Sequence, residues 1–358
     1  MADIPAFTPV HLLTGFLGSG KTTLLKRLLT DPALADTAVL INEFGEVGLD
    51  HYLVERIDET MVLLQSGCVC CTVRGELAEA LRDLHSKRER GLAPPFTRVV
   101  IESTGLADPF PVLSTLKSDP VLRHHFRAGS VVTTVDAVNG PAQLETYVES
   151  NRQAAIADHI VVTKADLCPG NAALVRLLSR LAELNPDAVR HSATVDGPDA
   201  DALFGDDTAH RAAKLQSASG FYCDTPTGLV AADGTVHQAA ISSFVITVDT
   251  PIDWTGFGVW LTMLLNRHGE RVLRVKGMLD IAGEDRPVAV HGVQHLVHPP
   301  VHMETWPVGE RSSRIVFIVD GLDPNLLKRS FNAFALAGRA ADSPQPEAAA
   351  PVRNAQSP

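Results

Sequence analysis

Residues 15–22 read GFLGSGKT, and this short stretch decides the fold class. It fits the pattern G-x-x-x-x-G-K-[ST] in full, with an apolar run before it and a helical pattern, KTTLLKRLLT, after it. The glycines at positions 15, 18 and 20 permit backbone angles closed to other residues, so successive N–H groups can turn inward around an anion. The stretch therefore predicts a phosphate-binding loop between a strand and a helix.

Two side chains of this loop have expected chemical roles. Lys21 should reach the β- and γ-phosphates of a nucleoside triphosphate, and the Thr22 hydroxyl is a natural Mg²⁺ ligand. The residues that we expect to contact the nucleotide here are Gly15, Phe16, Leu17, Gly18, Ser19, Gly20, Lys21, Thr22 and Thr23.

A carboxylate stands at the end of a later apolar run. Residues 99–109 read VVIESTGLADP, a predicted strand that ends in Glu102 and continues to Gly105. A carboxylate at this position can hold Mg²⁺, directly or through water. The N–H group of Gly105 can approach the γ-phosphate. Acids at strand ends often cap helices instead, but beside a complete phosphate loop the magnesium role is favoured.

The base is indicated by residues 163–166, which read TKAD after the apolar run HIVV. This is a variant of the N-K-x-D guanine motif, with Thr163 in the place of Asn. Asp166 can accept hydrogen bonds from guanine N1–H and the 2-amino group, whereas adenine presents a lone pair at N1. The stem of Lys164 would cover the base. We therefore expect a GTPase rather than a kinase that transfers phosphate from ATP to a small metabolite.

The order of patterns predicts an α/β fold with two parts. Over roughly the first 200 residues, apolar runs alternate with helical patterns, which is typical of a P-loop NTPase parallel sheet flanked by helices. A second block reads strand, helix, three strands, helix, and predicts a smaller α+β C-terminal domain. We expect a GTPase domain over residues 1–215, a linker over 216–240, the C-terminal domain over 241–338 and a disordered tail over 339–358.

In the second block, the sequence predicts which side chains are buried and which are exposed. The helical spacing of Trp254, Phe257, Leu261, Leu264 and Leu265 predicts one buried helix face. Arg274 and Lys276 stand in a predicted strand. A contact with a client or with the first domain is one interpretation, and an exposed polar face of the strand is the favoured one.

Four histidines, His291, His295, His298 and His302, recur at helical spacing, but a glycine and two prolines interrupt any helix. We expect strand and loop there, with the histidines on different faces and in ordinary polar or packing roles rather than in a second metal site.

Composition excludes some classes of function. The net charge of −11 disfavours a dedicated nucleic-acid binder, which needs positive surface. No apolar run reaches the roughly 18 residues of a membrane helix, and the first residues lack a basic and then apolar leader. We expect a cytoplasmic protein with neither a membrane nor a nucleic acid as partner.

Residues 67–72 read GCVCCT and hold three of the five cysteines. In the cytoplasm such a cluster indicates metal or redox chemistry more often than a disulfide. The thiolates of Cys68, Cys70 and Cys71 could bind Zn²⁺ and leave its fourth position open. Soft sulfur ligands favour Zn²⁺ or Cu⁺ over Mg²⁺, with Co²⁺ or Ni²⁺ also compatible. A vicinal redox pair and simple core packing are the alternatives.

An acidic stretch follows the second predicted strand. Residues 42–50 read NEFGEVGLD, and Glu43 and Glu46 lie where a first nucleotide-sensing segment is expected. Either could position the attacking water, hold Mg²⁺ through water, or supply an oxygen to a metal on the cysteines. A solvated acidic turn is the alternative.

The motifs GFLGSGKTT, NEFGEVGLD, GCVCCT, ESTGLADP and TKAD, in that order, resemble those of the CobW-like GTPases, metal-handling members of the P-loop class. In the second block, RVKGMLDI, HGVQHL and RIVFIVD resemble the C-terminal domain of that family. Ile41 stands where some relatives carry another glutamate, and the chain lacks the dense histidine run of many zinc-handling relatives.

The resemblance implies slow GTP hydrolysis coupled to delivery of a transition metal, zinc or cobalt, to a client metalloprotein. It implies that Cys68, Cys70 and Cys71 are metal ligands, with Glu46 beside them. We assign Lys21, Glu46 and Glu102 to hydrolysis. The alternative is a GTP-switched scaffold or thiol redox sensor without metal transfer, and assembly into an oligomer is left open.

Overall fold

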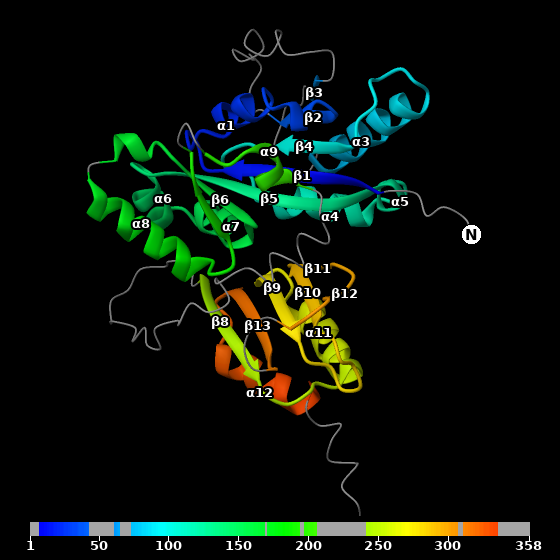
Figure 1. Cartoon of the computed structure of the whole chain (residues 1–358), viewed down its shortest axis with the longest axis vertical. Coiled ribbons are helices and arrows are strands. Elements are labelled where there is room, and N and C mark those ends of the chain that lie inside the picture. The colour runs from blue at the N-terminus through cyan, green and yellow to red at the C-terminus, as the bar shows by residue number, and fades with distance from the viewer. Residues whose placement is uncertain are drawn as a thin grey trace, which may run out of the picture.

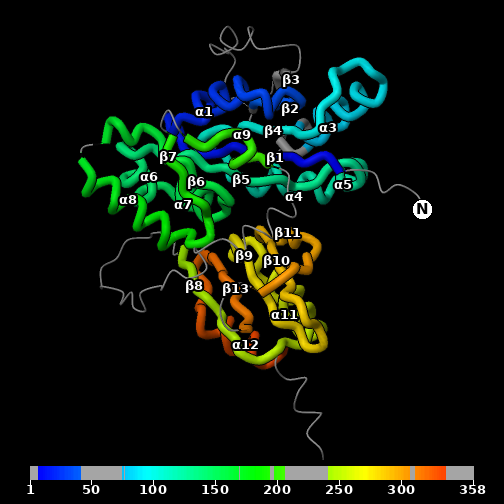
Figure 2. Tube along the Cα trace, in the orientation of Figure 1, coloured from blue at the N-terminus to red at the C-terminus, as the bar shows by residue number. Residues whose placement is uncertain are grey.

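The computed structural model describes residues 7–42, 61–64, 73–168, 170–193, 197–205, 241–306 and 311–335. Within these ranges the chain forms two sheets, one built before residue 206 and the other after residue 240 (Figures 1 and 2). The predicted domain limits near residues 215, 240 and 338 lie at or beyond the edges of the described ranges, so they stay predictions.

The first sheet has seven parallel strands in the order β3-β2-β4-β1-β5-β6-β7. The strands are β1 (Thr8–Gly15), β2 (Thr37–Asn42), β3 (Met61–Leu64), β4 (Arg98–Glu102), β5 (Phe126–Asp136), β6 (His159–Thr163) and β7 (Val189–Ser192). Every residue of β1 and β6 is buried, because helices cover both faces of the sheet. The predicted parallel sheet is confirmed.

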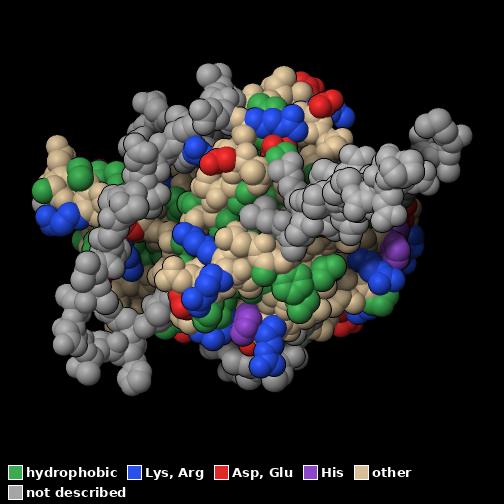
Figure 3. Space-filling view, turned by 90° about the horizontal axis from the view of Figure 1, so that it is seen from below, with side chains coloured by type: hydrophobic (Ala, Val, Ile, Leu, Met, Phe, Trp, Pro, Cys, Tyr) green, Lys and Arg blue, Asp and Glu red, His purple; other side chains and the backbone are tan. Residues whose placement is uncertain are grey.

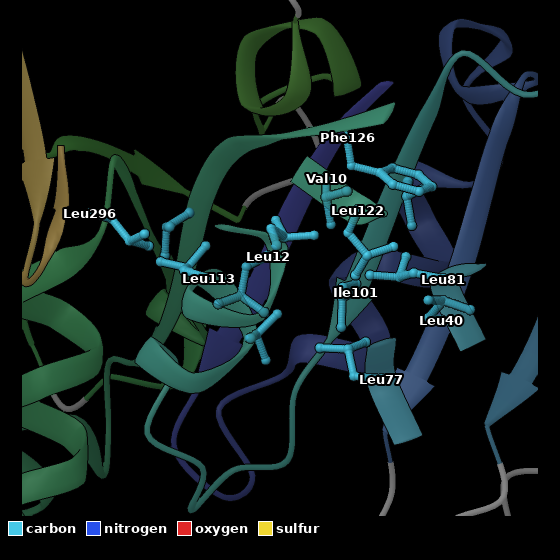
Figure 4. Packing of buried hydrophobic residues seen from close by; sticks show 14 of the residues in the cluster. Val10, Leu12, Leu40, Leu77, Leu81, Ile101, Leu113, Leu122, Phe126 and Leu296 are labelled. Atoms are coloured by element: carbon cyan, nitrogen blue, oxygen red, sulfur yellow. The ribbon is translucent and has the colours of Figure 1, made fainter. Parts of the chain in front are cut away.

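Helices join these parallel strands. They are α1 (Lys21–Leu28), α3 (Val73–Glu89), α4 (Phe110–Ser118), α5 (Leu122–His125), α6 (Gly140–Thr146), α7 (Val148–Ile156), α8 (Asn171–Leu184) and α9 (Ala200–Phe204), with 3₁₀ turns η1 (Pro32–Leu34) and η2 (Ala165–Leu167). Neighbouring side chains of β1 face opposite layers, as the pleat requires: Leu12 packs in the cluster with α3 and α4, and Leu13 in the cluster with α1 and α9. Figure 4 shows the first of these clusters.

The second unit is an antiparallel sheet covered by two helices. Its strands are β8 (Ile241–Val248), β9 (Val272–Leu279), β10 (Val288–Val293), β11 (Leu296–Val297), β12 (Val301–His302) and β13 (Ser313–Asp320), ordered β11-β10-β9-β13-β8 with β12 on β10. Helices α11 (Trp254–His268) and α12 (Pro324–Ala335) share a core with the sheet, in which Phe257, Trp260 and Phe331 pack together. The predicted α+β unit is confirmed. The prediction of the buried face is wrong for one residue: Trp254, in the first turn of α11, is 42% exposed.

The two units pack against each other through buried side chains. Leu273, Leu296 and Ile318 of the second sheet belong to the cluster formed by α3, α4 and the first sheet. In Figure 4, the Leu296 side chain lies next to Leu113 of α4, which belongs to the same cluster. Helices α11 and α12 therefore cover one face of the second sheet, and residues of the first unit pack against the other.

The favoured expectation for Arg274 is wrong. This arginine is 1% exposed and reaches across to the first unit, where Nη1 donates to the Ile156 carbonyl at 2.6 Å and Nη2 to Asp158 Oδ1 at 2.6 Å. A guanidinium is rarely buried unless it is paired, and here the partner comes from the other unit.

No helix among the described residues is long and apolar enough to cross a membrane. On the face drawn in Figure 3, the described Lys and Arg side chains lie in small groups among acidic and hydrophobic ones.

Candidate nucleotide site

The phosphate loop lies at the carboxyl end of β1, as the motif predicts. Gly18 and Gly20 take positive φ angles of 70° and 89°, which L side chains rarely adopt. Gly15 is required for space as well, because a Cβ there would meet the Thr134 carbonyl oxygen at 2.5 Å. Leu24 N–H donates to the Gly20 carbonyl at 2.9 Å, so the loop passes directly into α1. The positive end of that helix dipole faces the loop.

Hydroxyl groups hold the loop against the sheet. Ser19 Oγ lies 2.6 Å from Thr134 Oγ1 of β5, and Thr163 Oγ1 of β6 donates to the Ser19 carbonyl at 2.7 Å. The two hydroxyl partners come from β5, which pairs with β1, and from β6, the next strand along, so the sheet itself sets the position of the loop.

Lys21 begins α1 and turns back into the loop. Its ammonium donates to the carbonyl oxygens of Gly15 at 2.9 Å and Phe16 at 3.2 Å. Burial lowers the pKa of Lys21, and the nearby Glu102 carboxylate opposes this effect by raising it. A bound phosphate would act in the same direction as Glu102, since it also stabilises the charged ammonium.

Thr22 and Glu102 meet as predicted, although they are 80 positions apart. The Thr22 hydroxyl donates to Glu102 Oε1 at 2.7 Å, and Glu102 is 4% exposed. Mg²⁺ is bound in proteins by one or two carboxylates together with substrate phosphates. One hydroxyl and one carboxylate beside a phosphate loop therefore fit that ion.

Gly105 lies directly against the phosphate loop. A Cβ on Gly105 would meet the backbone nitrogen of Leu17 at 2.6 Å, so only glycine allows this approach. Ser103 N–H donates to the Leu13 carbonyl at 2.9 Å, and Ser103 Oγ to Thr14 Oγ1 at 2.8 Å. The segment after Glu102 is thus fixed to the strand that carries the loop.

The predicted base-binding residues begin at Thr163, the last residue of β6, and continue into the turn after it. Lys164 takes a positive φ of 55° and its ammonium donates to the Gly18 carbonyl at 2.7 Å, which joins this turn to the phosphate loop. Asp166 lies on η2 and is exposed. Thr163 is buried and holds Ser19.

Asp136 is a functional candidate that the sequence analysis missed. It is 1% exposed at the end of β5 and accepts a hydrogen bond from Lys164 Nζ at 2.8 Å. The backbone N–H groups of Val138 and Asn139 donate to the same carboxylate, at 2.7 and 3.1 Å. Burial raises the pKa of Asp136, but the hydrogen bonds from Lys164, Asn139 and Val138 outweigh it and hold the pKa below its usual value. The signal in the sequence was an acid at the end of an apolar run, VVTTVD.

Gln153 of α7 is the second candidate that was missed. It is fully buried, and its side-chain nitrogen donates to the carbonyls of Gly105 and Ala107, both at 3.1 Å. A single glutamine in a helix has no motif around it, so nothing in the sequence distinguishes it.

The predicted transition-metal residues, Cys68, Cys70, Cys71 and Glu46, lie outside the described residues. The described strand before the cysteines, β3, ends at Leu64, which pairs with Asn42 at the carboxyl edge of the sheet. Elsewhere in the described ranges, no group of three or more His, Cys, Asp or Glu side chains is placed to hold a metal ion.

The four histidines lie in strand and loop, as expected, but two of them share a face. The rings of His291 and His298 stack with their centroids 4.8 Å apart, while His295 contacts Phe110 of the first unit. The expectation that the histidines point to different faces is therefore wrong for this pair.

Comparison with known proteins agrees with this geometry. Residues 9–191 match the family described as CobW/HypB/UreG, nucleotide-binding domain, and residues 241–335 match the cobalamin synthesis protein cobW C-terminal domain. The zinc chaperone YjiA of Escherichia coli is 36% identical over 327 residues, which cover 90% of this chain and 97% of that protein. The zinc-regulated GTPase metalloprotein activator 1 of Schizosaccharomyces pombe is 35% identical over 171 residues, which cover 46% of this chain and 40% of that protein.

A solved structure is similar over nearly the whole length. The crystal structure of Zn(II)-bound YjiA GTPase from E. coli superposes with a TM-score of 0.67 at 29% identity, and covers 92% of this chain and 99% of that one. The family match, the YjiA relative and the shared fold lead to one conclusion. This chain belongs to the CobW/HypB/UreG family of P-loop proteins and carries the cobW C-terminal domain.

Proposed function

We propose that this protein binds and hydrolyses GTP and uses that cycle to hand a transition metal, zinc first and cobalt second, to a client metalloprotein. The observation that carries the nucleotide half is the assembled phosphate site, in which the Thr22 and Glu102 oxygens lie 2.7 Å apart beside the glycine loop. The metal half is supported by the relatives named zinc chaperones and by the cysteine-rich residues 67–72.

In the proposed reaction, a water oxygen bonds to the γ-phosphorus while the bond from that phosphorus to the β–γ bridging oxygen breaks, and the proton that the water loses passes to the released phosphate. Lys21 places its positive charge beside the phosphates once they replace the Gly15 and Phe16 carbonyls as its partners. When Mg²⁺ is bound, it neutralises charge on the β- and γ-phosphate oxygens. Thr22 and Glu102 hold that ion, and Glu46 is the proposed group that orients the attacking water.

Recognition of the nucleotide extends to both ends of the ligand. Asp166 is proposed to accept the N1–H and 2-amino hydrogens of guanine, with Thr163 and Lys164 shaping the turn from which it projects. The N–H of Gly105 is proposed to meet the γ-phosphate, which GDP lacks. The base contact therefore sets specificity for guanine, and the Gly105 contact distinguishes GTP from GDP.

Cys68, Cys70 and Cys71 are the proposed ligands of the transported metal, with Glu46 beside them. Three thiolates leave one position of a tetrahedral zinc ion open, which suits an ion that must pass to another protein. The cytoplasm is the proposed location, because a free cysteine cluster requires a reducing compartment.

The test combines nucleotide and zinc binding on the reduced protein. Binding of GDP and ADP is compared by calorimetry, and zinc binding is measured for the native chain and for Cys70→Ser. The proposal expects a strong preference for GDP and a marked loss of zinc affinity in Cys70→Ser, with Cys168→Ser as the matched control because Cys168 lies outside the cluster. Equal binding of ADP would reject the GTPase assignment. Unchanged zinc binding in Cys70→Ser would favour the scaffold or redox sensor instead.

A further inference from the structure

Helix α7 touches both the segment after Glu102 and the C-terminal domain. On one side, Gln153 and Arg152 contact residues 105–108. On the other side, Arg152 contacts Asp320, and the carbonyl of Ile156 at the end of the helix accepts from Arg274. One short helix thus carries contacts to two parts of the molecule that are far apart in the sequence.

The partners of the Gln153 side chain determine which of its polar atoms makes the contact. Both of its partners are carbonyl oxygens, those of Gly105 and Ala107, so the side-chain amide must present its nitrogen to them. The main chain of Gln153 is fixed as well, since Thr133 Oγ1 of β5 donates to its carbonyl at 2.8 Å. A fully buried side chain on an anchored helix residue thus holds the carbonyls of two residues in this segment.

Gly105, whose carbonyl accepts from Gln153, is also the residue that lies against the phosphate loop. Gly105 is close enough to Leu17 that an added Cβ would stand 2.6 Å from its backbone nitrogen. Fixing the Gly105 carbonyl restricts rotation of the peptide that follows Gly105, and with it the direction in which the segment faces the phosphates. Within the described ranges, Oε1 of Gln153 has no hydrogen-bond partner, so the same side chain retains an acceptor for an N–H of a rearranged segment.

The neighbouring Arg152 extends this contact to the other domain. Its two terminal nitrogens reach Asp108 Oδ2 at 3.3 Å and Asp320 Oδ2 at 3.2 Å. These side chains are 22–37% exposed, so each ion pair alone is weak. Asp108 also accepts from Phe110 N–H at 3.0 Å, at the first residue of α4, and this helix packs against Leu296 of the second unit.

We propose that Gln153 is a positioning residue for GTP hydrolysis, which holds residues 105–108 in place for the γ-phosphate, and that Arg152 joins the same segment to the C-terminal domain through Asp320. This inference rests on the proposed contact between Gly105 and the γ-phosphate. It adds that the C-terminal domain influences the hydrolysis rate through α7.

The first test replaces Gln153 by Met, which keeps the length of the side chain and removes both hydrogen bonds. Two buried bonds of ordinary strength correspond to a drop of about tenfold in kcat, with GDP affinity within about twofold of the native value. Gln153→Glu should also lower kcat, because a buried glutamate that faces two carbonyl oxygens can donate at most one hydrogen bond, and only in its protonated form. A role limited to packing would lower the melting temperature and weaken GDP and GTP equally, and that result would overturn the proposal.

The second test removes the interdomain contact without touching the nucleotide site. Asp320→Asn should change kcat by about two- to threefold, the scale of one partly exposed ion pair. The matched control is Glu270→Gln, which removes the same charge from an exposed position of the same domain and should leave kcat unchanged. Equal kcat values in the two variants would reject the part of the proposal that concerns Arg152.

Hydrogen exchange of residues 103–110 separates this inference from the proposed function. In the native protein, a non-hydrolysable GTP analogue should protect this peptide more than GDP does. If it does not, the proposed γ-phosphate contact fails. If the native protein shows the difference and Gln153→Met retains it in full, the contact stands and the role of Gln153 is rejected.

Discussion

Replacing Asp136 by Asn tests how the base-binding turn is attached to the phosphate loop. In the structure the buried Asp136 carboxylate lies 2.8 Å from Lys164 Nζ, and the same ammonium reaches the Gly18 carbonyl at 2.7 Å. Asn keeps the shape of the side chain but loses the negative charge, so Lys164 is left without its anionic partner. We expect the turn that carries Asp166 to lose its fixed position relative to the loop.

The magnitude follows from the number and type of the bonds lost. Hydrogen bonds to charged groups contribute about 1.5–3 kcal/mol, while Asn can still accept from the N–H groups of Val138 and Asn139. Asn also loses the bond that Asn139 Nδ2 donates to Asp136 Oδ2 at 3.1 Å. The Lys164 bond, which joins the turn to the loop, by itself predicts a 10- to 100-fold weaker nucleotide affinity, at about 1.4 kcal/mol for each factor of ten. GDP and GTP should weaken by the same factor, because the base and the loop are common to both.

The assay is a titration with fluorescent GDP and with a non-hydrolysable GTP analogue, together with a melting curve. Asp83→Asn is the matched control, since Asp83 pairs with Lys87 at 2.7 Å but both side chains are 44–49% exposed. Such an exposed pair should change affinity by less than a factor of about two. Native affinity in Asp136→Asn, or a loss confined to GTP, would refute the reasoning.

Three further predictions follow from the site and the interface. Burial lowers the pKa of Lys21, and the charged ammonium is the form that binds phosphate. GTP affinity should therefore be at its maximum below this lowered pKa. It should decline as the pH rises through that pKa, which lies below the value of about 10.4 for free lysine. A pH titration against Lys21→Arg, whose guanidinium stays charged, isolates this effect, and identical profiles would contradict it. Gly105→Ala should weaken nucleotide binding and lower the melting temperature, because its Cβ would meet Leu17 N at 2.6 Å; a native melting curve and native affinity would show that the segment lies elsewhere. Arg274→Met should reduce the free energy of unfolding by about 3 kcal/mol in a urea titration, since it removes the buried guanidinium that pairs with Asp158 at 2.6 Å; a change below about 0.5 kcal/mol would mean that the domains do not pack as described.

The sequence predicts the parts of the fold that follow a simple pattern. The strands β4 and β6 are continuous apolar runs, and the glycine loop fixes the strand and helix around it. The strand β7 was missed, because Val189–Ser192 is largely exposed and reads VRHS, without an apolar run. The four residues of β3 were too few to stand out from the polar stretch before them.

At the site, motif spacing predicted the pair Thr22 and Glu102, because both residue types have a defined place in phosphate-binding proteins. Spacing could not predict Gln153 or Arg274. Their roles depend on which helix lies beside which strand, and a polar residue in a helix or strand is exposed in most proteins. Only the packing of α7 between the two units brings their partners within reach.

The most direct test of the account is a zinc titration of the reduced protein in three states: without nucleotide, with GDP, and with a non-hydrolysable GTP analogue. If nucleotide and metal are coupled, zinc affinity should differ between the GDP and GTP states by at least tenfold, or about 1.4 kcal/mol. Linkage then requires zinc to change the ratio of GTP to GDP affinity by the same factor. Identical zinc affinities in all three states would contradict the coupling and leave a GTPase whose cysteines serve another purpose.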